Sequence, residues 1–316
     1  MTDKGADALQ QRIKAVSADL EILAGPGDGF RVNEPMKKHT SFNIGGPADV
    51  FVIPRSTEVL QGMIRICRAE DIPCHIIGNG TNIIVGDNGI RGVVIRVSGN
   101  FCNYAKIRDY AVEAGAGMLL TRLSSVALEE SLSGLEFASG IPGTVGGAIF
   151  MNAGAYGGEM KDIVEWTQYM DENGDIRELS CDEHNFGYRT SFFEKNGGII
   201  LKTRVRLKPG EPDAIKSLMG ELTKRRKKTQ PLDMPSAGSV FKRAPGYYTW
   251  NLIEGCNLRG YSIGGAQVSE KHCGFIVNTG SATASDVIRL IDHIRECIMR
   301  KFEVDLQPEV KIIGER

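Results

Sequence analysis

The chain has 316 residues, of which 41% are hydrophobic and 24% are charged, and its formal net charge is −1. This length predicts two or three subdomains, and the composition predicts a globular fold of mixed helix and strand. The balanced charge excludes a general attraction to nucleic acid or to an anionic membrane. Because we find neither a signal-type apolar region nor a membrane-length apolar run, we expect a cytoplasmic protein.

The first third of the chain predicts helices and strands in alternation. Apolar residues recur at helical spacing from Leu9 to Leu23 and predict an N-terminal helix. Ser56 is expected to cap a second helix, which Pro73 ends. The run Cys74–Val85 reads as a strand, a glycine loop and another strand, and Gly92–Val97 adds a further strand.

The remainder predicts a second series of elements. A helix is expected at Met118–Leu132, and the Asn173-Gly174 dipeptide between strand-like runs predicts a hairpin. Another strand is expected at Gly197–Leu207. A linker at Pro209–Pro212 is followed by a helix, and further helices are expected near 249–256 and at 285–302.

Two glycine loops are candidates for a nucleotide site. Gly78–Asn82 reads GNGTN, and its freed amides could form an anion-binding nest. Ser139–Gly158 reads SGIPGTVGGAIFMNAGAYGG, in which seven of twenty residues are glycine and none is charged. So many glycines suggest that a large ligand lies against this backbone. The alternative is two unrelated structural turns, for which the shorter loop is the stronger case.

Standard cofactor and metal motifs are absent from the sequence. Gly80 is not followed by the third glycine of GxGxxG, and no GxxxxGK[ST] occurs. There is no HExxH and no metal-type Cys/His cluster, so we expect no metal. Seven cysteines without C-x-x-C spacing favour reduced thiols over a disulfide framework. The residues therefore suggest a dinucleotide site that is neither Rossmann nor P-loop.

Taken together, the motifs resemble the UDP-N-acetylenolpyruvoylglucosamine reductase family, whose members are bacterial flavoenzymes of peptidoglycan synthesis. The matching stretches run in order from about Thr40 to Glu315: SFNIGGPAD, IIGNGTNIIV, SGIPGTVGGAIFMNAGAYGGE, FGYRTSFF, AGSVFKR, GGAQVSEKHCGFIVN and PEVKIIGE. The resemblance covers nearly the whole chain. It implies an α+β fold with two small FAD-binding subdomains, similar to those of vanillyl-alcohol oxidase, and a third α+β substrate-binding domain.

The resemblance also implies domain boundaries and a noncovalent FAD site. We expect a first FAD-binding subdomain at 1–98 with 305–316, a second at 99–220, and the substrate-binding domain at 221–304. The FAD diphosphate is expected on GNGTN, with the longer glycine segment against the cofactor. The implied cofactor-binding residues are Gly78, Asn79, Gly80, Thr81, Asn82, Ser139, Gly140, Ile141, Pro142, Gly143, Thr144, Gly146, Gly147, Ala148, Asn152, Gly154, Ala155, Tyr156, Gly157, Ile200 and Arg206.

The implied reaction has two halves. NADPH passes hydride to FAD, and the reduced flavin passes hydride from N5 to the vinyl carbon of UDP-N-acetylglucosamine enolpyruvate. Negative charge then builds up as an enolate, which needs a cation or donor and a proton source on the opposite face. The product is UDP-N-acetylmuramate.

Arg189, Ser239 and Glu309 match the family's catalytic residues. The Arg189 guanidinium would hold the carboxylate as the enolate forms, although a surface arginine would look the same in sequence. Ser239 would donate the proton to carbon, and its ordinary alternative is a turn or capping serine. Glu309 would be protonated through burial or would orient a donor, and its alternative is an exposed glutamate.

Substrate contacts are expected from Lys242, Arg259, His272 and Arg226. The basic run Lys224–Lys228 could bind nucleotide phosphates, including the extra phosphate of NADPH, or could simply complement a helix dipole. The chain lacks room for the tyrosine-bearing insertion of the family's long type. An aromatic group at 247, 248 and 250 could line the substrate entrance or pack the helix.

Two rival functions remain open at this stage. One is a flavin oxidase with covalently held FAD, for which His39, His75 or a cysteine could supply the link. The other is a nucleotide-binding regulatory module without chemistry, against which the three candidate catalytic residues stand. We expect a monomer that binds neither nucleic acid nor membrane.

Overall fold

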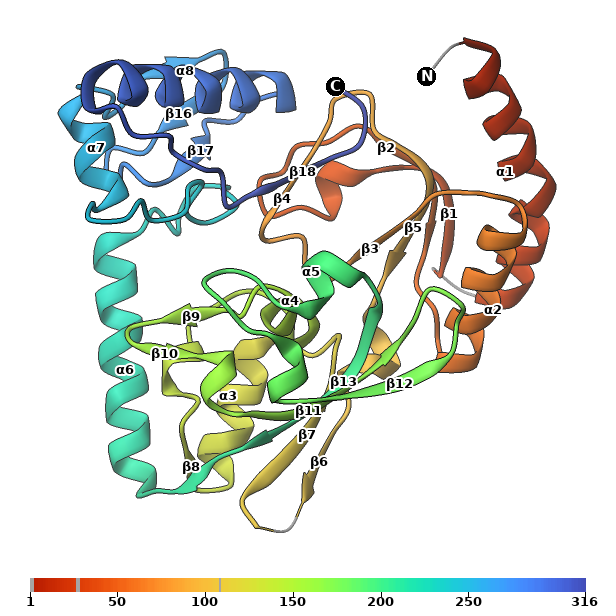
Figure 1. Cartoon of the computed structure of the whole chain (residues 1–316), viewed down its shortest axis with the longest axis horizontal. Coiled ribbons are helices and arrows are strands. Elements are labelled where there is room, and N and C mark those ends of the chain that lie inside the picture. The colour runs from red at the N-terminus through yellow and green to blue at the C-terminus, as the bar shows by residue number, and fades with distance from the viewer. Residues whose placement is uncertain (1–2, 27–28, 108) are drawn as a thin grey trace. The chain divides into compact units, whose positions relative to one another are not determined.

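The computed structural model describes residues 3–26, 29–107 and 109–316, and its chain folds into two compact units. Unit 1 is formed within residues 1–34, 49–79 and 92–224, and unit 2 within residues 35–48, 80–91 and 225–316. Each unit is described by itself below (Figure 1). The expected division into three domains stays a prediction.

Unit 1 begins with helix α1 (Asp3–Ala24), as the apolar spacing predicts. Helix α2 (Thr57–Ala69) starts at Ser56, whose side chain accepts the Val59 N–H at 3.3 Å, so the predicted cap is confirmed. Strands β1 (Phe30–Pro35), β2 (Pro47–Val52), β5 (Ile90–Arg96) and β3 (Cys74–Ile77) form a sheet in the order β1-β2-β5-β3. Strand β3 runs parallel to β5.

A five-stranded antiparallel sheet forms the second part of unit 1, in the order β12-β11-β13-β7-β6. Its strands are β6 (Tyr104–Ile107), β7 (Ala111–Gly115), β11 (Val164–Met170), β12 (Ile176–Ser180) and β13 (Ile199–Arg206). The predicted hairpin is confirmed, because Met170 pairs with Ile176 and Gly174 takes a φ of 83° in the turn. Two short pairs accompany this sheet: β8 (Leu132–Ser133) with β14 (Lys208–Pro209), and β9 (Gly154–Ala155) with β10 (Gly158–Glu159).

The remaining helices of unit 1 are α3 (Leu120–Glu129), α4 (Val145–Phe150) and α5 (Phe192–Asn196). Helix α3 is shorter than the predicted span, because Leu119 is extended and Ser131 takes a φ of 57°. Helix α4 lies inside the long glycine segment and was not predicted. Helix α6 (Pro212–Thr229) begins at a proline and runs on without a break past residue 224.

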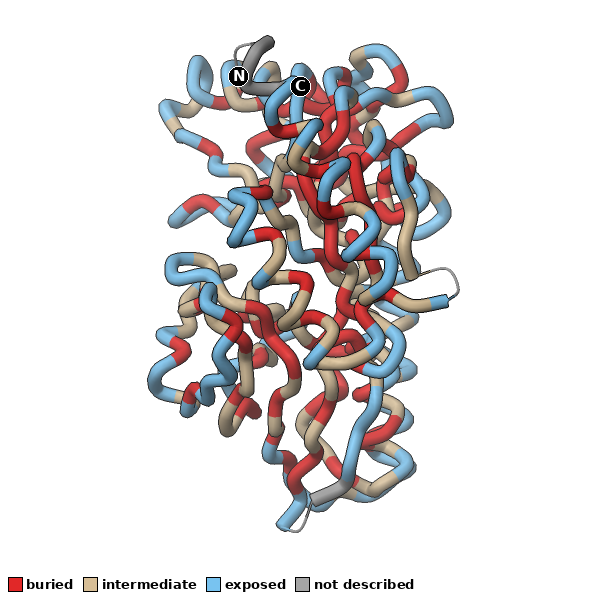
Figure 2. Tube along the Cα trace, turned by 90° about the vertical axis from the view of Figure 1, so that its right-hand side faces the viewer, coloured by how far each residue is buried: buried red, intermediate tan, exposed pale blue. Residues whose placement is uncertain are grey.

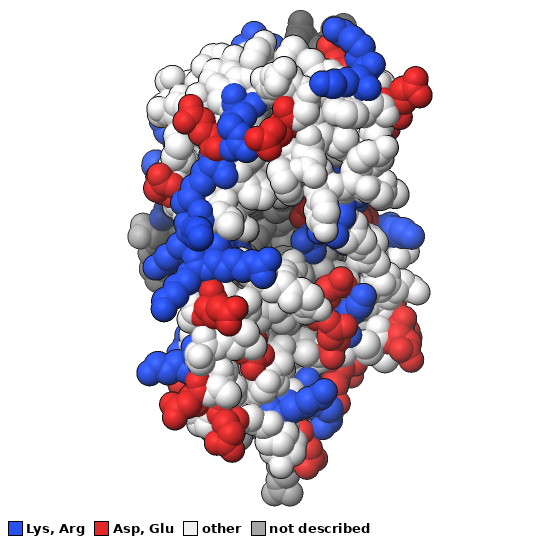
Figure 3. Space-filling view, turned by 90° about the vertical axis from the view of Figure 1, so that its left-hand side faces the viewer, with Lys and Arg blue, Asp and Glu red and all other residues white. Residues whose placement is uncertain are grey.

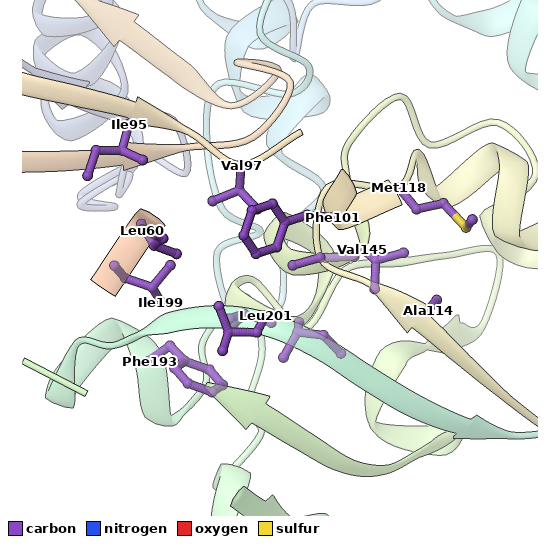
Figure 4. Packing of buried hydrophobic residues seen from close by; sticks show 14 of the residues in the cluster. Leu60, Ile95, Val97, Phe101, Ala114, Met118, Val145, Phe193, Ile199 and Leu201 are labelled. Atoms are coloured by element: carbon purple, nitrogen blue, oxygen red, sulfur yellow. The ribbon is translucent and has the colours of Figure 1, made fainter. Parts of the chain in front are cut away.

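One hydrophobic core joins both parts of unit 1. It contains Leu60 of α2, Ile95 of β5 and Leu201 of β13, together with Phe101 and Val145. Figure 4 shows Val97 beside Phe101 and Leu60 beside Ile199. Figure 2 shows buried stretches alternating with exposed ones along the chain. The buried residues Ile77, at the end of β3, and Ala138, at the end of a 3-10 turn, directly precede the two glycine loops, and Ala138 belongs to this core.

Unit 2 is built around helices α7 (Thr249–Gly255) and α8 (Ala284–Phe302), close to the predicted spans. An antiparallel sheet of β15 (Ser262–Ile263), β16 (Ala266–Val268) and β17 (Ile276–Asn278) packs with them around a second core. Strand β18 (Lys311–Ile313) runs parallel to β4 (Ile83–Val85), so the end of the chain lies beside the strand that follows GNGTN.

Short 3-10 turns occur at Met36–Lys38, Gly99–Cys102, Glu136–Ala138, Met160–Asp162 and Asp182–His184.

Candidate functional site

The two glycine loops predicted from sequence meet within unit 1. A Cβ built on Gly78 would overlap the Thr144 Oγ1 and would stand 3.2 Å from its Cγ2. The Asn79 side chain donates to the Pro142 carbonyl at 2.9 Å. The start of GNGTN therefore packs directly on the segment PGT at 142–144, and the absence of a side chain at Gly78 makes this contact possible.

Thr144 sets the local structure of the longer loop. Its backbone is extended, and its Oγ1 accepts the Gly147 N–H at 3.2 Å, so it is the N-cap of α4. Val145 and Ile149 of this helix are buried. The amphipathic turn is anchored by these side chains, and its exposed face carries Gly147.

The chain's own packing accounts for several glycines of the long segment. A Cβ on Gly146 would stand 3.0 Å from the Ala116 Cβ, and one on Gly158 would stand 2.6 Å from the Phe137 ring. Gly154 faces Glu159 in the same way, at 2.7 Å. The expectation that one large ligand explains the whole glycine content is therefore too broad. Gly147 is different, because its nearest neighbour, the Thr144 Oγ1, would lie at an ordinary 3.4 Å.

Ser139 offers the clearest sign of a missing partner. Its Oγ is buried and has no hydrogen-bond partner in the structure, whereas its N–H donates to the Glu136 carbonyl. Buried polar atoms are nearly always paired, so an orphan hydroxyl at the start of the longer glycine loop suits a ligand that supplies the partner. The predicted FAD fits this requirement.

The other predicted cofactor residues of unit 1 differ in their surroundings. Ile141 and Ala148 contribute to the core, Tyr156 is exposed at the tip of the β9–β10 hairpin, and the Gly143 carbonyl accepts from Leu120. The remaining members of the segment, Gly140, Ala155 and Gly157, are half-buried or exposed. Ile200 is buried in the core. Arg206 is held by Glu165 and by the Asp109 carbonyl.

Arg189 lies in a tight turn of unit 1. Gly187 and Thr190 bond to each other across the turn, and Arg189 takes a φ of 56°. The Arg189 guanidinium donates to the Gly154 carbonyl at 3.1 Å and lies over the Tyr188 ring. The structure therefore brings this arginine to the glycine segment, where a solvated surface arginine would make no such contact.

Ser239 and Glu309 lie on adjacent extended segments of unit 2. The Glu309 N–H donates to the Val240 carbonyl at 2.7 Å, and the Lys242 N–H donates to Gln307. Val310 also donates to the Val240 carbonyl, at 3.4 Å. Two successive donors on one carbonyl form a β-bulge, which bends the strand and redirects its side chains. The bulge thus falls at one of the predicted catalytic residues.

The second half of GNGTN approaches the same place. Gly80 has a φ of 63°, and a Cβ on it would overlap the His39 carbonyl, so this position requires glycine. The Asn82 side chain donates to the Glu309 carbonyl at 3.3 Å, and the Lys311 N–H donates to Asn82. Thr81 is half-buried beside it. Within unit 2, the loop is therefore joined to the segment that carries Glu309 and leads into β18.

His272 reaches the Ser239 segment from the other side. A Cβ on Gly274 would lie 3.0 Å from the His272 ring and 3.4 Å from the Ser239 Oγ. Burial lowers the pKa of His272, and the Arg259 charge lowers it further against a backbone hydrogen bond. The lowered pKa favours the neutral ring, whose Nδ1 accepts the Gly274 N–H at 3.1 Å; its role in binding substrate stays a prediction.

The other predicted substrate residues belong to unit 2, where Arg259 is exposed and Lys242 and Arg226 are half-buried. Arg259 is engaged by the Glu254 carboxylate and the Glu270 carbonyl, and the hydrogen bond to Glu254 raises its pKa. The Lys242 carbonyl accepts from Thr249. Arg226 lies in the last turn of α6 with Lys227 and Lys228. Figure 3 shows a cluster of Lys and Arg side chains on the face of the molecule that it presents to the viewer.

The described residues show neither a metal site nor a membrane helix. No group of three or more potential metal-ligating side chains occurs among residues 3–26, 29–107 and 109–316. No helix in that part of the chain is long and apolar enough to cross a membrane. All cysteines there are free thiols, in agreement with the sequence.

The sequence predicts Asn152 as a cofactor-binding residue, but it does not indicate that Asn152, Ser191 and His184 support the Arg189 turn. Asn152 and Ser191 both hydrogen-bond between the glycine segment and the turn, and His184 stacks on Phe186 just before it. Asn152 and Ser191 are visible in the sequence only as polar residues within motifs, which does not reveal their partners 35 and 41 positions away.

Comparison with known proteins agrees with this site. A family model described as "FAD binding domain" matches residues 48–180, which include both glycine loops. The α+β fold and this match confirm the predicted fold class, and together with the site they define an FAD-dependent oxidoreductase.

The relatives narrow this class to one family. The model for the C-terminal domain of UDP-N-acetylenolpyruvoylglucosamine reductase matches residues 230–313. The reductase of Caldanaerobacter subterraneus subsp. tengcongensis is 53% identical over 90% of this chain and 94% of its own length. The reductase of Clostridioides difficile is 52% identical over 94% of this chain and 96% of its own length. The crystal structure of the Thermus caldophilus reductase superimposes with a TM-score of 0.77 at 36% identity, over 90% of this chain and 97% of its own.

The chain therefore belongs to the UDP-N-acetylenolpyruvoylglucosamine reductase family, which acts in peptidoglycan precursor synthesis. The resemblance found in the sequence is confirmed.

Proposed function

We propose that the chain uses NADPH and noncovalent FAD to reduce UDP-N-acetylglucosamine enolpyruvate to UDP-N-acetylmuramate in the bacterial cytoplasm. When bound, FAD carries hydride from NADPH to the enolpyruvyl double bond. The observation that carries the proposal is the packing of Gly78 and Asn79 on residues 142–144, beside the orphan Ser139 hydroxyl. Gly78–Asn82 and the 139–158 segment would hold the cofactor, with their amides toward its phosphates.

Arg189 would bind the substrate carboxylate and stabilise the charge that develops beside it. Its Nη2 donates to the Gly154 carbonyl at 3.1 Å, and a guanidinium is the group that can hold a carboxylate with two parallel hydrogen bonds. A guanidinium keeps its charge at any pH at which the protein folds. This permanence suits a group that must meet a transient enolate.

Ser239 would donate the proton to carbon. Its Oγ donates to the Phe241 carbonyl at 3.3 Å, which is long for a bond between two oxygens. The hydroxyl can therefore rotate toward substrate at little cost. The His272 ring lies close by, and its lowered pKa favours the neutral form.

Glu309 would act at the enolate that forms on the substrate. Its backbone is fixed from two directions, by the Val240 carbonyl and by Asn82. The bulge at Glu309 and Val310 supports a directed side chain, as at other active sites. We propose that it acts with Arg189 on the enolate, either protonated or through a hydrogen-bond donor that it holds.

The test separates the two half-reactions of the Ser239→Ala variant. Without oxygen, NADPH should bleach the flavin of the variant at the wild-type rate, because Ser239 takes no part in that step. Return of the yellow colour on adding enolpyruvyl substrate should slow by about 10²–10⁴-fold, the usual contribution of a positioned acid. Ser262→Ala is the matched control, because Ser262 makes a similar 3.3 Å bond to a carbonyl two residues away. Wild-type rates in both halves would refute the proton-donor role.

A further inference from the structure

A crossed pair of hydrogen bonds connects the Arg189 turn to the glycine segment. The Asn152 Nδ2 donates to the Gly187 carbonyl at 3.0 Å, and the Arg189 guanidinium donates to the Gly154 carbonyl at 3.1 Å. Each side chain thus bonds to the backbone two residues from the other. All four residues belong to unit 1.

The orientation of the Asn152 amide follows from its three partners. Its Nδ2 also donates to the Glu159 carboxylate at 2.9 Å, and its Oδ1 accepts the Lys161 N–H at 3.0 Å. A flipped amide would place its oxygen against two acceptors, so this orientation is the stable one. Glu159 is itself fixed by a capping box with Asp162. Both amide hydrogens are therefore used inside the protein.

The turn needs such support because of its backbone. Arg189 has a φ of 56° and Asn152 a φ of 42°, in the left-handed region. Asparagine adopts this region readily, whereas arginine does so rarely and is held there by its surroundings. The Ser191 Oγ adds a third bond, donating to the Phe150 carbonyl at 2.8 Å. Asn152 has an exposed fraction of 1%, so water does not compete for its bonds.

We propose that Asn152 is a positioning residue, which holds the Arg189 turn at the distance and angle that the second half-reaction requires. The inference rests on the proposed role of Arg189 and assigns the Asn152 side chain to the turn, because its amide has no hydrogen left for the cofactor. Loss of the amide would leave the FAD site formed and the arginine present but displaced.

The test compares five variants by anaerobic half-reactions, FAD titration and thermal unfolding. Asn152→Asp keeps the size and the left-handed preference but replaces the two donors by an acceptor. Asn185→Ala is the control for backbone strain, because Asn185 is exposed and also has a positive φ, of 46°. Arg189→Lys keeps the positive charge and loses the paired N–H donors of the guanidinium. The fourth variant combines Asn152→Asp with Arg189→Lys.

We expect Asn152→Asp to slow flavin reoxidation by substrate at least 10-fold, with flavin reduction by NADPH and the FAD dissociation constant unchanged within 2-fold. Asn185→Ala should leave all three unchanged. The double variant should be no slower than Arg189→Lys, because Asn152 is proposed to act only by positioning Arg189. Ser191→Ala, which removes only the third bond, should give a smaller loss of the same kind even if Asn152→Asp does not fold.

Three results would overturn the inference: normal reoxidation in Asn152→Asp, a weakened FAD affinity as its main effect, or a multiplicative loss in the double variant. If Asn152→Asp does not fold, normal reoxidation in Ser191→Ala would do the same. If Arg189→Lys itself reoxidises normally, the proposed role of Arg189 fails, which is a separate outcome.

Discussion

Gly78 and Thr144, 66 positions apart in the sequence, lie in direct contact. No side chain separates them, and the Thr144 hydroxyl that would meet a Cβ on Gly78 is the same one that caps α4. One contact therefore joins the two glycine loops and sets the start of the helix in the second loop. A side chain at position 78 would therefore disturb both the contact between the loops and the start of α4.

Gly78→Ala should destabilise the protein and weaken its cofactor site together. Displacing Thr144 removes a helix cap and forces the loops apart, for which we expect a loss of about 1–3 kcal/mol in the free energy of unfolding. The FAD dissociation constant should rise by about tenfold, the equivalent of about 1.4 kcal/mol. Urea denaturation and flavin fluorescence titration measure the two effects. Gly220→Ala is the control, since a Cβ there would meet no atom within 4 Å, and equal behaviour of the two variants would contradict the account.

Gly147→Ala and Gly146→Ala should have opposite effects on the apoprotein. A Cβ on Gly147 meets only the Thr144 Oγ1 at 3.4 Å, so alanine should preserve or raise stability, by up to about 1 kcal/mol. A Cβ on Gly146 would press on Ala116 and should cost about 1–3 kcal/mol. If FAD lies on the exposed face of α4, Gly147→Ala should nevertheless weaken FAD binding. Unchanged FAD affinity in this stable variant would show that FAD does not lie on the exposed face of α4.

Ser139→Ala and Ser124→Ala separate a ligand contact from a structural one. The Ser139 hydroxyl has no partner in the protein, so its removal should leave the apoprotein at least as stable and should raise the FAD dissociation constant about 5- to 10-fold, the value of one hydrogen bond. Ser124 donates to the Leu135 carbonyl at 2.8 Å, so Ser124→Ala should cost about 1 kcal/mol without changing FAD affinity. Identical FAD binding in Ser139→Ala and wild type would show that the hydroxyl does not meet the cofactor.

His184 should make the stability of the apoprotein depend on pH. Burial lowers its pKa, against the hydrogen bonds to Ser180 and Cys181 and the charge of Glu183, which raise it. The unfolded chain therefore takes up the proton first, and stability is lost as pH falls from about 6.5, the ordinary histidine value, toward the folded value. His184→Gln should be less stable at pH 7.5, because the bonds to Ser180 and Thr167 are altered, yet should lose less on acidification to pH 5.5. If the free energy of unfolding falls equally with pH in wild type and His184→Gln, groups other than His184 cause the pH dependence.

Local signals in the sequence predicted much of the fold. Amphipathic spacing located α1 and α8, Ser56 marked the start of α2, and the Asn173-Gly174 turn defined the β11–β12 hairpin. Each of these depends on residues within a few positions of one another. Helix α4 escaped prediction because glycine, a poor helix former, occupies its second and third positions, and its stability comes from buried Val145 and Ile149.

The candidate site was predictable only as a set of motifs. The glycine loops could be read as ligand-binding segments, but their contact at Gly78 and Thr144 could not, since nothing local fixes it. The same holds for Asn152, whose partner Gly187 is 35 positions away. The glycines of the long segment were also overinterpreted, because a sequence does not distinguish a glycine that faces a ligand from one, such as Gly158, that faces the Phe137 ring.

The most direct measurement of the central claim is an anaerobic absorbance titration of the purified wild-type protein. We predict that the protein carries FAD that acid releases completely, that stoichiometric NADPH bleaches it, and that one equivalent of UDP-N-acetylglucosamine enolpyruvate then restores the yellow colour. Folded protein that takes up no FAD, or flavin that stays bleached when this substrate is added, would contradict the account.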